Sequence, residues 1–214
     1  MIPIVSIVGK SNSGKTTLIE RVVPELAGRG YRVATIKHDV HGFEIDREGK
    51  DSWRHRRAGT YMVILSSPKQ IALIQDVDRD LSLEELRERF VQDVDIVLSE
   101  GFKRDSQPKI EVFREEEHGE LMCSVEDNLI AVATDRKVDL PVPCLDMNDG
   151  KGVADFIEER FLRQRGGEGI SLVVDGRSVS MTPFIKTLFT TTIRAMVSTL
   201  KGCHDPRRIR IILE

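Results

Sequence analysis

Hydrophobic positions along the chain fall into short runs of strand length, separated by segments in which apolar residues recur every three or four positions. The two periods alternate from residue 4 to residue 162, and such alternation is typical of an α/β protein. We therefore expect a doubly wound, mostly parallel sheet. The expected strands are residues 4–8, 31–37, 61–65, 70–74, 94–101, 108–114 and 129–135, and the expected helices are residues 17–26, 50–59, 83–90 and 149–162.

Two of these segments carry more specific signals. The sequence Ser82-Leu83-Glu84-Glu85 has the capping-box pattern, so a helix should begin at Leu83. Residues 108–114 alternate between polar and apolar side chains. That alternation predicts a strand with one buried face and one solvent-exposed face.

Composition changes after residue 163, where residues 164–169 read as a polar, glycine-rich linker. We expect a main domain of residues 1–163 and a small α+β appendage of residues 170–214. The appendage should follow a ββαβ order, with a hairpin turn at Asp175-Gly176, a helix from Pro183 and a closing strand near residues 209–213. Since about 45 residues rarely form a stable core alone, the appendage should pack on the main domain or on a second subunit.

The first apolar run leads directly into Gly9-x4-Gly14-Lys15-Thr16, the pattern of a phosphate-binding P-loop. A strand precedes the loop and a helix follows it, so backbone N–H groups and the helix N-terminus offer positive partial charge to a polyphosphate. In this pattern Lys15 reaches the β- and γ-phosphates and the Thr16 hydroxyl binds Mg²⁺. The predicted fold class is therefore a P-loop NTPase. The loop residues expected to hold the nucleotide are Gly9, Lys10, Ser11, Asn12, Ser13, Gly14, Lys15, Thr16 and Thr17.

Acidic residues follow three of the predicted strands. In a parallel sheet the carboxyl ends of the strands form the ligand crevice, so Asp39, Glu100 and Asp135 should lie near the loop. We expect Glu100 to organise Mg²⁺ and water, and Asp39 to be a further ligand of the metal or of water. Asp135 could accept hydrogen bonds from the N1–H and amino groups of guanine. No arginine finger or glutamine is evident beside the site, which favours slow hydrolysis.

Composition also narrows the class of partner. A net charge of −3 over 214 residues provides no basic field for nucleic acid. No apolar run approaches the roughly 18–20 residues that cross a bilayer, and no signal peptide is predicted at the N-terminus. Three widely separated cysteines favour a reducing, cytoplasmic setting over a disulfide scaffold.

Several motifs occur in order along the main domain. They are the P-loop with Thr17, Ile36-Lys37-His38-Asp39, His41-Gly42, Asp46, Gly49-Lys50-Asp51-Ser52, Ala58-Gly59, Ser99-Glu100-Gly101-Phe102-Lys103 and Pro108-Lys109-Ile110-Glu111-Val112-Phe113-Arg114. Together they resemble the MobB family, the molybdopterin-guanine dinucleotide biosynthesis protein B. The stretch after Gly166 is not part of the common core of that family.

The resemblance implies a homodimer that binds GTP with Mg²⁺ and hydrolyses it slowly. It implies a molybdopterin guanylyltransferase as the protein partner, which attaches GMP to molybdopterin with the assistance of the GTP-binding protein. Molybdopterin or its guanine dinucleotide is a further expected ligand. Because the chain lacks a full Asn-Lys-x-Asp signature, the preference for guanine over adenine rests mainly on the resemblance.

Lys10 is a candidate catalytic residue, with Lys15, Asp39 and Glu100. It follows the first loop glycine, as the signature lysine does in dimeric P-loop ATPases with a deviant loop, although Ser11 stands where those proteins carry glycine. By that similarity Lys10 could reach the phosphates of a neighbouring subunit. The alternative is an exposed lysine that attracts phosphate in general.

Two other classes of function fit parts of the pattern. A P-loop transferase would use residues 37–51 to bind a small molecule that accepts phosphate. A metal-delivery GTPase would carry its ion on His38 and His41, whose imidazoles suit transition metals. In the helix at residues 50–59, Arg54 and Arg57 lie one turn apart and either bind a phosphate of a pterin or form a solvated basic face.

Overall fold

The computed structural model describes residues 1–39, 42–43, 45–114, 120–136, 141–163, 170, 172–174, 177–179, 181–204, 209 and 211. The chain is divided into two compact units, one of residues 2–154 and one of Met1 with residues 155–214. The strands of the first unit are β1 (Ile4–Val8), β2 (Val33–Lys37), β3 (Met62–Ser66), β4 (Ile71–Gln75), β5 (Ile96–Glu100), β6 (Lys109–Phe113), β7 (Leu129–Thr134) and β8 (Cys144–Asp146). Its helices are α1 (Lys15–Gly28), α2 (Asp51–Arg57), α3 (Leu83–Phe90) and the start of α5 (Gly150–Ile157).

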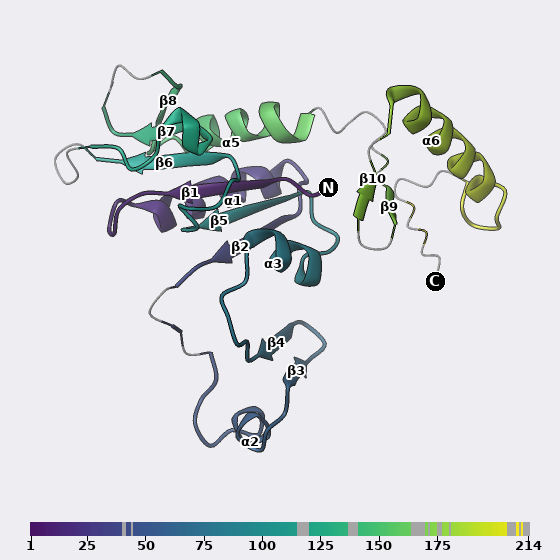
Figure 1. Cartoon of the computed structure of the whole chain (residues 1–214), viewed down its shortest axis with the longest axis horizontal. Helices are drawn as coiled ribbons and strands as arrows, with labels where there is room; N and C mark the ends of the chain where they lie inside the picture. The colour runs from purple at the N-terminus through teal and green to yellow at the C-terminus, as the bar shows by residue number, and fades with distance from the viewer. Residues whose placement is uncertain are drawn as a thin grey trace. The chain divides into compact units, whose positions relative to one another are not determined.

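Within the described residues, six strands form one parallel sheet in the order β2-β5-β1-β6-β7-β8 (Figure 1). Its central strands β1, β6 and β7 consist entirely of buried residues, as parallel strands covered on both faces require. This confirms the predicted α/β class with a parallel sheet. Because the strands run the same way, the loops that follow them gather at one edge of the sheet.

Helices α1 and α3 bury apolar side chains toward the sheet. In α1, Leu18, Val22 and Leu26 recur every four residues and are buried, and the helix contacts β1, β2 and β5. Leu83 of α3 is fully buried in a cluster with Ile4 of β1. The spacing in α1 shows the helical period from which that helix was predicted.

The predicted capping box of α3 is present. Ser82 Oγ accepts a hydrogen bond from the Glu85 N–H at 3.2 Å, and the Glu85 carboxylate accepts one from the Ser82 N–H at 3.0 Å. Hydrogen bonds from the Arg79 guanidinium and then from the Ser82 N–H lower the pKa of Glu85 to about 2. The helix begins at Leu83, as predicted.

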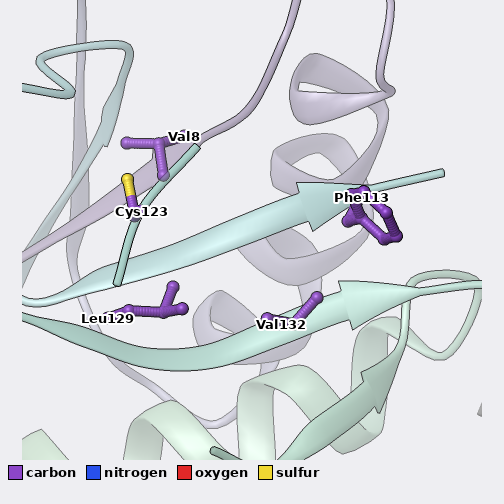
Figure 2. Close-up of a cluster of buried hydrophobic side chains, with 5 residues drawn as sticks. All are labelled: Val8, Phe113, Cys123, Leu129 and Val132. Atoms are coloured by element: carbon purple, nitrogen blue, oxygen red, sulfur yellow. The ribbon is translucent and has the colours of Figure 1, made fainter. Parts of the chain in front are cut away.

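A cluster of buried side chains joins β1, β6 and β7 to the segment before β7 (Figure 2). Its members are Val8, Phe113, Cys123, Leu129 and Val132. Burial raises the pKa of the Cys123 thiol, with a further contribution from the Glu111 carboxylate. This thiol therefore packs as a small apolar side chain.

Strand β6 is buried along its whole length, which corrects the prediction of a half-exposed strand. One of its polar positions, Lys109, is only 1% exposed. Its Nζ atom donates to the carbonyl oxygens of Asp105, Gln107 at 3.3 Å and Asp127 at 2.6 Å. Backbone carbonyls thus replace the water that an exposed ammonium would bind.

The other polar position of β6, Glu111, is 2% exposed. Its carboxylate accepts hydrogen bonds from the backbone N–H groups of Met122, at 2.7 Å, and Cys123, at 2.9 Å. Both charged side chains of this strand therefore anchor loops, and their polarity does not mark a solvent-exposed face.

The first unit also contains a separate antiparallel hairpin, β3–β4, whose strands lie one residue beyond the predicted ones. The short helix α2 contacts β3. Strand β8 was not predicted. It has only three residues, with two prolines before it and a polar turn after it. Such a short segment has too few positions to show a period.

The second unit contains the π-helical turn Glu158–Leu162, the antiparallel pair β9 (Leu172–Val174) and β10 (Arg177–Val179), and α6 (Pro183–Ser198). The Thr182 side chain accepts a hydrogen bond from the Ile185 N–H and caps α6. The predicted hairpin turn and most of the predicted closing strand lie outside the described residues. Within the described part of the chain, no helix combines the length and apolar character needed to cross a membrane.

Candidate nucleotide-binding site

The turn between β1 and α1 depends on two glycines. Gly9 has φ of +147° and Gly14 has φ of +98°, conformations that side chains disfavour. A Cβ atom on Gly9 would lie 2.5 Å from the carbonyl oxygen of Val112 and 2.7 Å from Ser13 Oγ. Ser13 Oγ is itself buried and has no hydrogen-bond partner among the described residues. The turn can therefore take this path only with glycine at position 9.

Lys15, the first residue of α1, folds back over the loop. Its Nζ atom donates to the carbonyl oxygens of Gly9, at 3.1 Å, and Lys10, at 2.7 Å. Burial lowers the pKa of Lys15, while the Glu100 carboxylate raises it and the Lys37 ammonium lowers it. A bound anion beside this ammonium would favour its charged form.

Thr16 and Glu100 bring a hydroxyl and a carboxylate together beside the loop. Thr16 Oγ1 donates to both carboxylate oxygens of Glu100, at 2.9 Å and 3.0 Å. Lys37 Nζ of β2 lies 3.7 Å from Glu100 Oε1. Hydroxyl and carboxylate oxygens are the hard ligands that Mg²⁺ prefers, so these side chains fit the predicted metal.

The loop after β5 packs against the end of β2. Gly101 has φ of +96°, and a Cβ atom there would lie 3.3 Å from the Cβ atom of His38. The imidazole of His38 lies against the ring of Phe102, with 4.6 Å between centroids, and its Nε2 is 2.7 Å from Asp80 Oδ2. His41 lies outside the described residues, and no group of three potential metal ligands occurs among the His, Cys, Asp and Glu residues that are described.

The other predicted site residues occupy the same edge of the sheet, on both sides of the loop. Asp39 follows β2 and Asp135 follows β7, and both are exposed. Because β5 and β6 flank β1, the acids Asp39 and Glu100 lie on one side of the loop and Asp135 on the other. Of the loop residues, the exposed ones are Lys10, Ser11, Asn12, Thr16 and Thr17.

One arginine that is not among the predicted site residues lies beside the loop. Arg114 directly follows β6, and its Nη2 atom lies 3.7 Å from the position that a Cβ on Gly14 would occupy. On the same glycine, the Cε atom of Met147 lies 3.1 Å from that position. The available signal was the place of Arg114 after a strand, but nothing local in the sequence shows that β6 pairs with β1.

The basic face of α2 makes contacts within its own helix. Arg54 Nη1 is 3.8 Å from Asp51 Oδ1, and the Arg57 guanidinium lies 5.4 Å from the ring centroid of Trp53. An exposed ion pair of this kind contributes little to stability. Binding of a pterin phosphate by these arginines remains a prediction.

A parallel sheet that carries a P-loop between its first strand and first helix defines a P-loop NTPase fold. A family model described as molybdopterin guanine dinucleotide synthesis protein B, MobB, matches residues 4–135. The chain belongs to the MobB family, which confirms the resemblance found in its motifs.

Individual proteins agree with this assignment. The molybdopterin-guanine dinucleotide biosynthesis adapter protein of Haemophilus influenzae is 41% identical over 158 residues, which cover 73% of this chain and 88% of that protein. The protein of the same name from Escherichia coli is 37% identical over 170 residues, covering 78% of this chain and 97% of that protein. The crystal structure of Bacillus subtilis MobB matches with a TM-score of 0.60 and 28% identity, covering 76% of this chain and 99% of that one.

Proposed function

We propose that this protein is an adapter of molybdopterin-guanine dinucleotide biosynthesis that binds GTP with Mg²⁺ and hydrolyses it slowly. The observation that carries the proposal is the pairing of Thr16 with Glu100 beside a P-loop, in a chain of the MobB family. Mg²⁺ would neutralise charge between the phosphates when bound. The nucleotide-binding domain is residues 1–163, and residues 170–214 form an appendage to it.

The loop residues have separate tasks in this proposal. Lys15 exchanges its bonds to the Gly9 and Lys10 carbonyl oxygens for bonds to phosphate oxygens, and the loop amides bind the remaining oxygens. Thr16 and Glu100 hold the metal, with Asp39 as a further ligand of the metal or of water. The protein's part in hydrolysis is to position charge and water, because phosphoryl transfer requires little covalent chemistry from protein groups.

The adapter role requires partners. We propose a cytoplasmic homodimer that assists a molybdopterin guanylyltransferase, with molybdopterin or its guanine dinucleotide as a further ligand. The names of the relatives, adapter proteins of molybdopterin-guanine dinucleotide biosynthesis, support the adapter part of this proposal. Product analysis tests this proposal against a transferase. GTP should yield only GDP and phosphate, whereas a phosphorylated small molecule in the presence of candidate acceptors would contradict the adapter role.

Lys10 is proposed to act on the nucleotide of a neighbouring subunit. Lys10→Ala should reduce GTP turnover at least about tenfold, since a cation supplied from another subunit stabilises charge in the transition state. The dependence of specific activity on protein concentration should also disappear. Steady-state phosphate release over a range of protein concentrations measures both. Unchanged turnover with unchanged concentration dependence would contradict the trans-acting role.

Asp135 is proposed to select guanine. Asp135→Asn should weaken GTP binding at least about tenfold, because the amide cannot accept hydrogen bonds from both N1–H and the amino group of guanine. XTP, which carries an oxygen in place of that amino group, should bind relatively better. Competition of GTP, XTP and ATP against a fluorescent nucleotide measures this shift. An unchanged order of affinities would show that Asp135 does not contact the base.

A further inference from the structure

Arg114 flanks the P-loop on the side opposite to the predicted metal site. Strand β1 pairs with β5 on one side and with β6 on the other. Thr16 contacts Glu100 at the end of β5, whereas Arg114 follows β6. A nucleotide whose metal-bound phosphates lie at Thr16 and Glu100 therefore has its α-phosphate and nucleoside available to the side where Arg114 stands.

The guanidinium of Arg114 lies beside Gly14 of the loop. Its Nη2 atom lies 3.7 Å from the Cβ position on Gly14, and the residue is half-buried. The charged groups that act on the Lys15 ammonium are Glu100 and Lys37, which belong to β5 and β2. The loop thus has two cations with different surroundings, Lys15 toward the acidic side and Arg114 toward β6.

Hydrogen bonds connect the neighbouring strand ends to each other and to α1. The Met147 N–H donates to the Thr134 carbonyl at 3.0 Å, and the Arg136 N–H donates to Thr134 Oγ1 at 3.3 Å. Arg21 Nη1 of α1 donates to the Met147 carbonyl at 2.9 Å and to Asn148 Oδ1 at 2.8 Å. The segment after β8 is therefore hydrogen-bonded to β7 and to α1.

We propose that Arg114 binds the nucleotide at its α-phosphate and nucleoside side, and that it sets affinity for the nucleotide without taking part in cleavage of the γ-phosphate. A guanidinium suits this place because its planar donors bind phosphate oxygens and its face stacks on an aromatic base. The inference rests on the proposed function and adds a binding residue to the same site.

Calorimetry of Arg114→Ala with GTP, GDP and inorganic pyrophosphate, each with Mg²⁺, tests the inference. Affinity for GTP and GDP should fall about tenfold or more, as for the loss of one charge-assisted contact. Affinity for pyrophosphate, which lacks both the α-phosphate and the nucleoside, should stay within twofold of wild type. The kcat at saturating GTP should also be unchanged. Arg114→Lys should lose affinity partially, because it keeps the charge but not the planar stacking group.

Arg89→Ala, an exposed arginine of α3, is the matched control and should bind all three ligands like wild type. Equal losses for pyrophosphate and GTP, a lower kcat with unchanged GDP affinity, or no change in Arg114→Ala would each overturn the inference. If Arg114→Ala does not fold, Arg114→Lys replaces it in the test. Wild-type affinity of Arg114→Lys for GDP would then overturn the inference. Wild-type protein that binds no GTP would overturn the proposed function and the inference together, whereas wild-type binding with an unaffected Arg114→Ala overturns the inference alone.

Discussion

Lys15→Ala is expected to reduce GTP turnover about 10²- to 10³-fold, the usual loss when one preorganised donor to a developing charge is removed. The Lys15 ammonium is held over the loop by the Gly9 and Lys10 carbonyls, so it is already placed where phosphate oxygens would bind. Its lowered pKa adds a dependence on pH. The unliganded Lys15 ammonium loses its proton at a lower pH than an exposed lysine does. The affinity of the wild-type protein for GTP should therefore begin to fall at a lower pH than it would with a lysine of ordinary pKa at this position.

Phosphate release and nucleotide binding measure these effects. Lys69→Ala is a suitable control, because Lys69 is an exposed lysine in the turn between β3 and β4. It should leave GTP binding and turnover unchanged. Turnover of Lys15→Ala within twofold of wild type would show that the loop does not act on the phosphates.

Lys109→Met is expected to lower the free energy of unfolding by about 2–4 kcal/mol. Methionine has a similar length but cannot donate hydrogen bonds. The substitution would therefore leave the carbonyl oxygens of Asp105, Gln107 and Asp127 without their buried ammonium partner. These carbonyls belong to the segments before β6 and β7, so both segments should loosen.

Denaturant unfolding of Lys109→Met against Lys103→Met measures the loss. Lys103 is an exposed lysine in the loop between β5 and β6, and its substitution should change the stability by less than about 0.5 kcal/mol. A loss below about 1 kcal/mol for Lys109→Met would mean that water replaces the ammonium at these carbonyls.

Local patterns in the sequence were sufficient for the P-loop, for α3 and for the buried strands β1, β5 and β7. The P-loop motif of residues 9–16 and the capping box of residues 82–85 each depend only on residues that are close together in the sequence. Alternation failed at β6, where it predicted an exposed face. The charges of Lys109 and Glu111 are instead satisfied by backbone groups of loops that lie elsewhere in the sequence.

Strand order set the limit for the candidate site. Acids at strand ends could be predicted to lie near the loop, because all strands of a parallel sheet end at one edge. Which side of the loop each residue occupies depends on the pairing of β1 with β5 and β6, and no local period encodes that pairing. Arg114 was missed for this reason. The contact of His38 with Asp80 was missed because the two residues are 42 positions apart in the sequence.

The most direct measurement of the central claim is calorimetric titration of the wild-type protein with GTP and with ATP, each with Mg²⁺ and with chelator. We expect saturable binding of one GTP per chain that weakens when Mg²⁺ is removed, with weaker binding of ATP. Absence of saturable GTP binding in the presence of Mg²⁺ would show that this P-loop does not bind GTP.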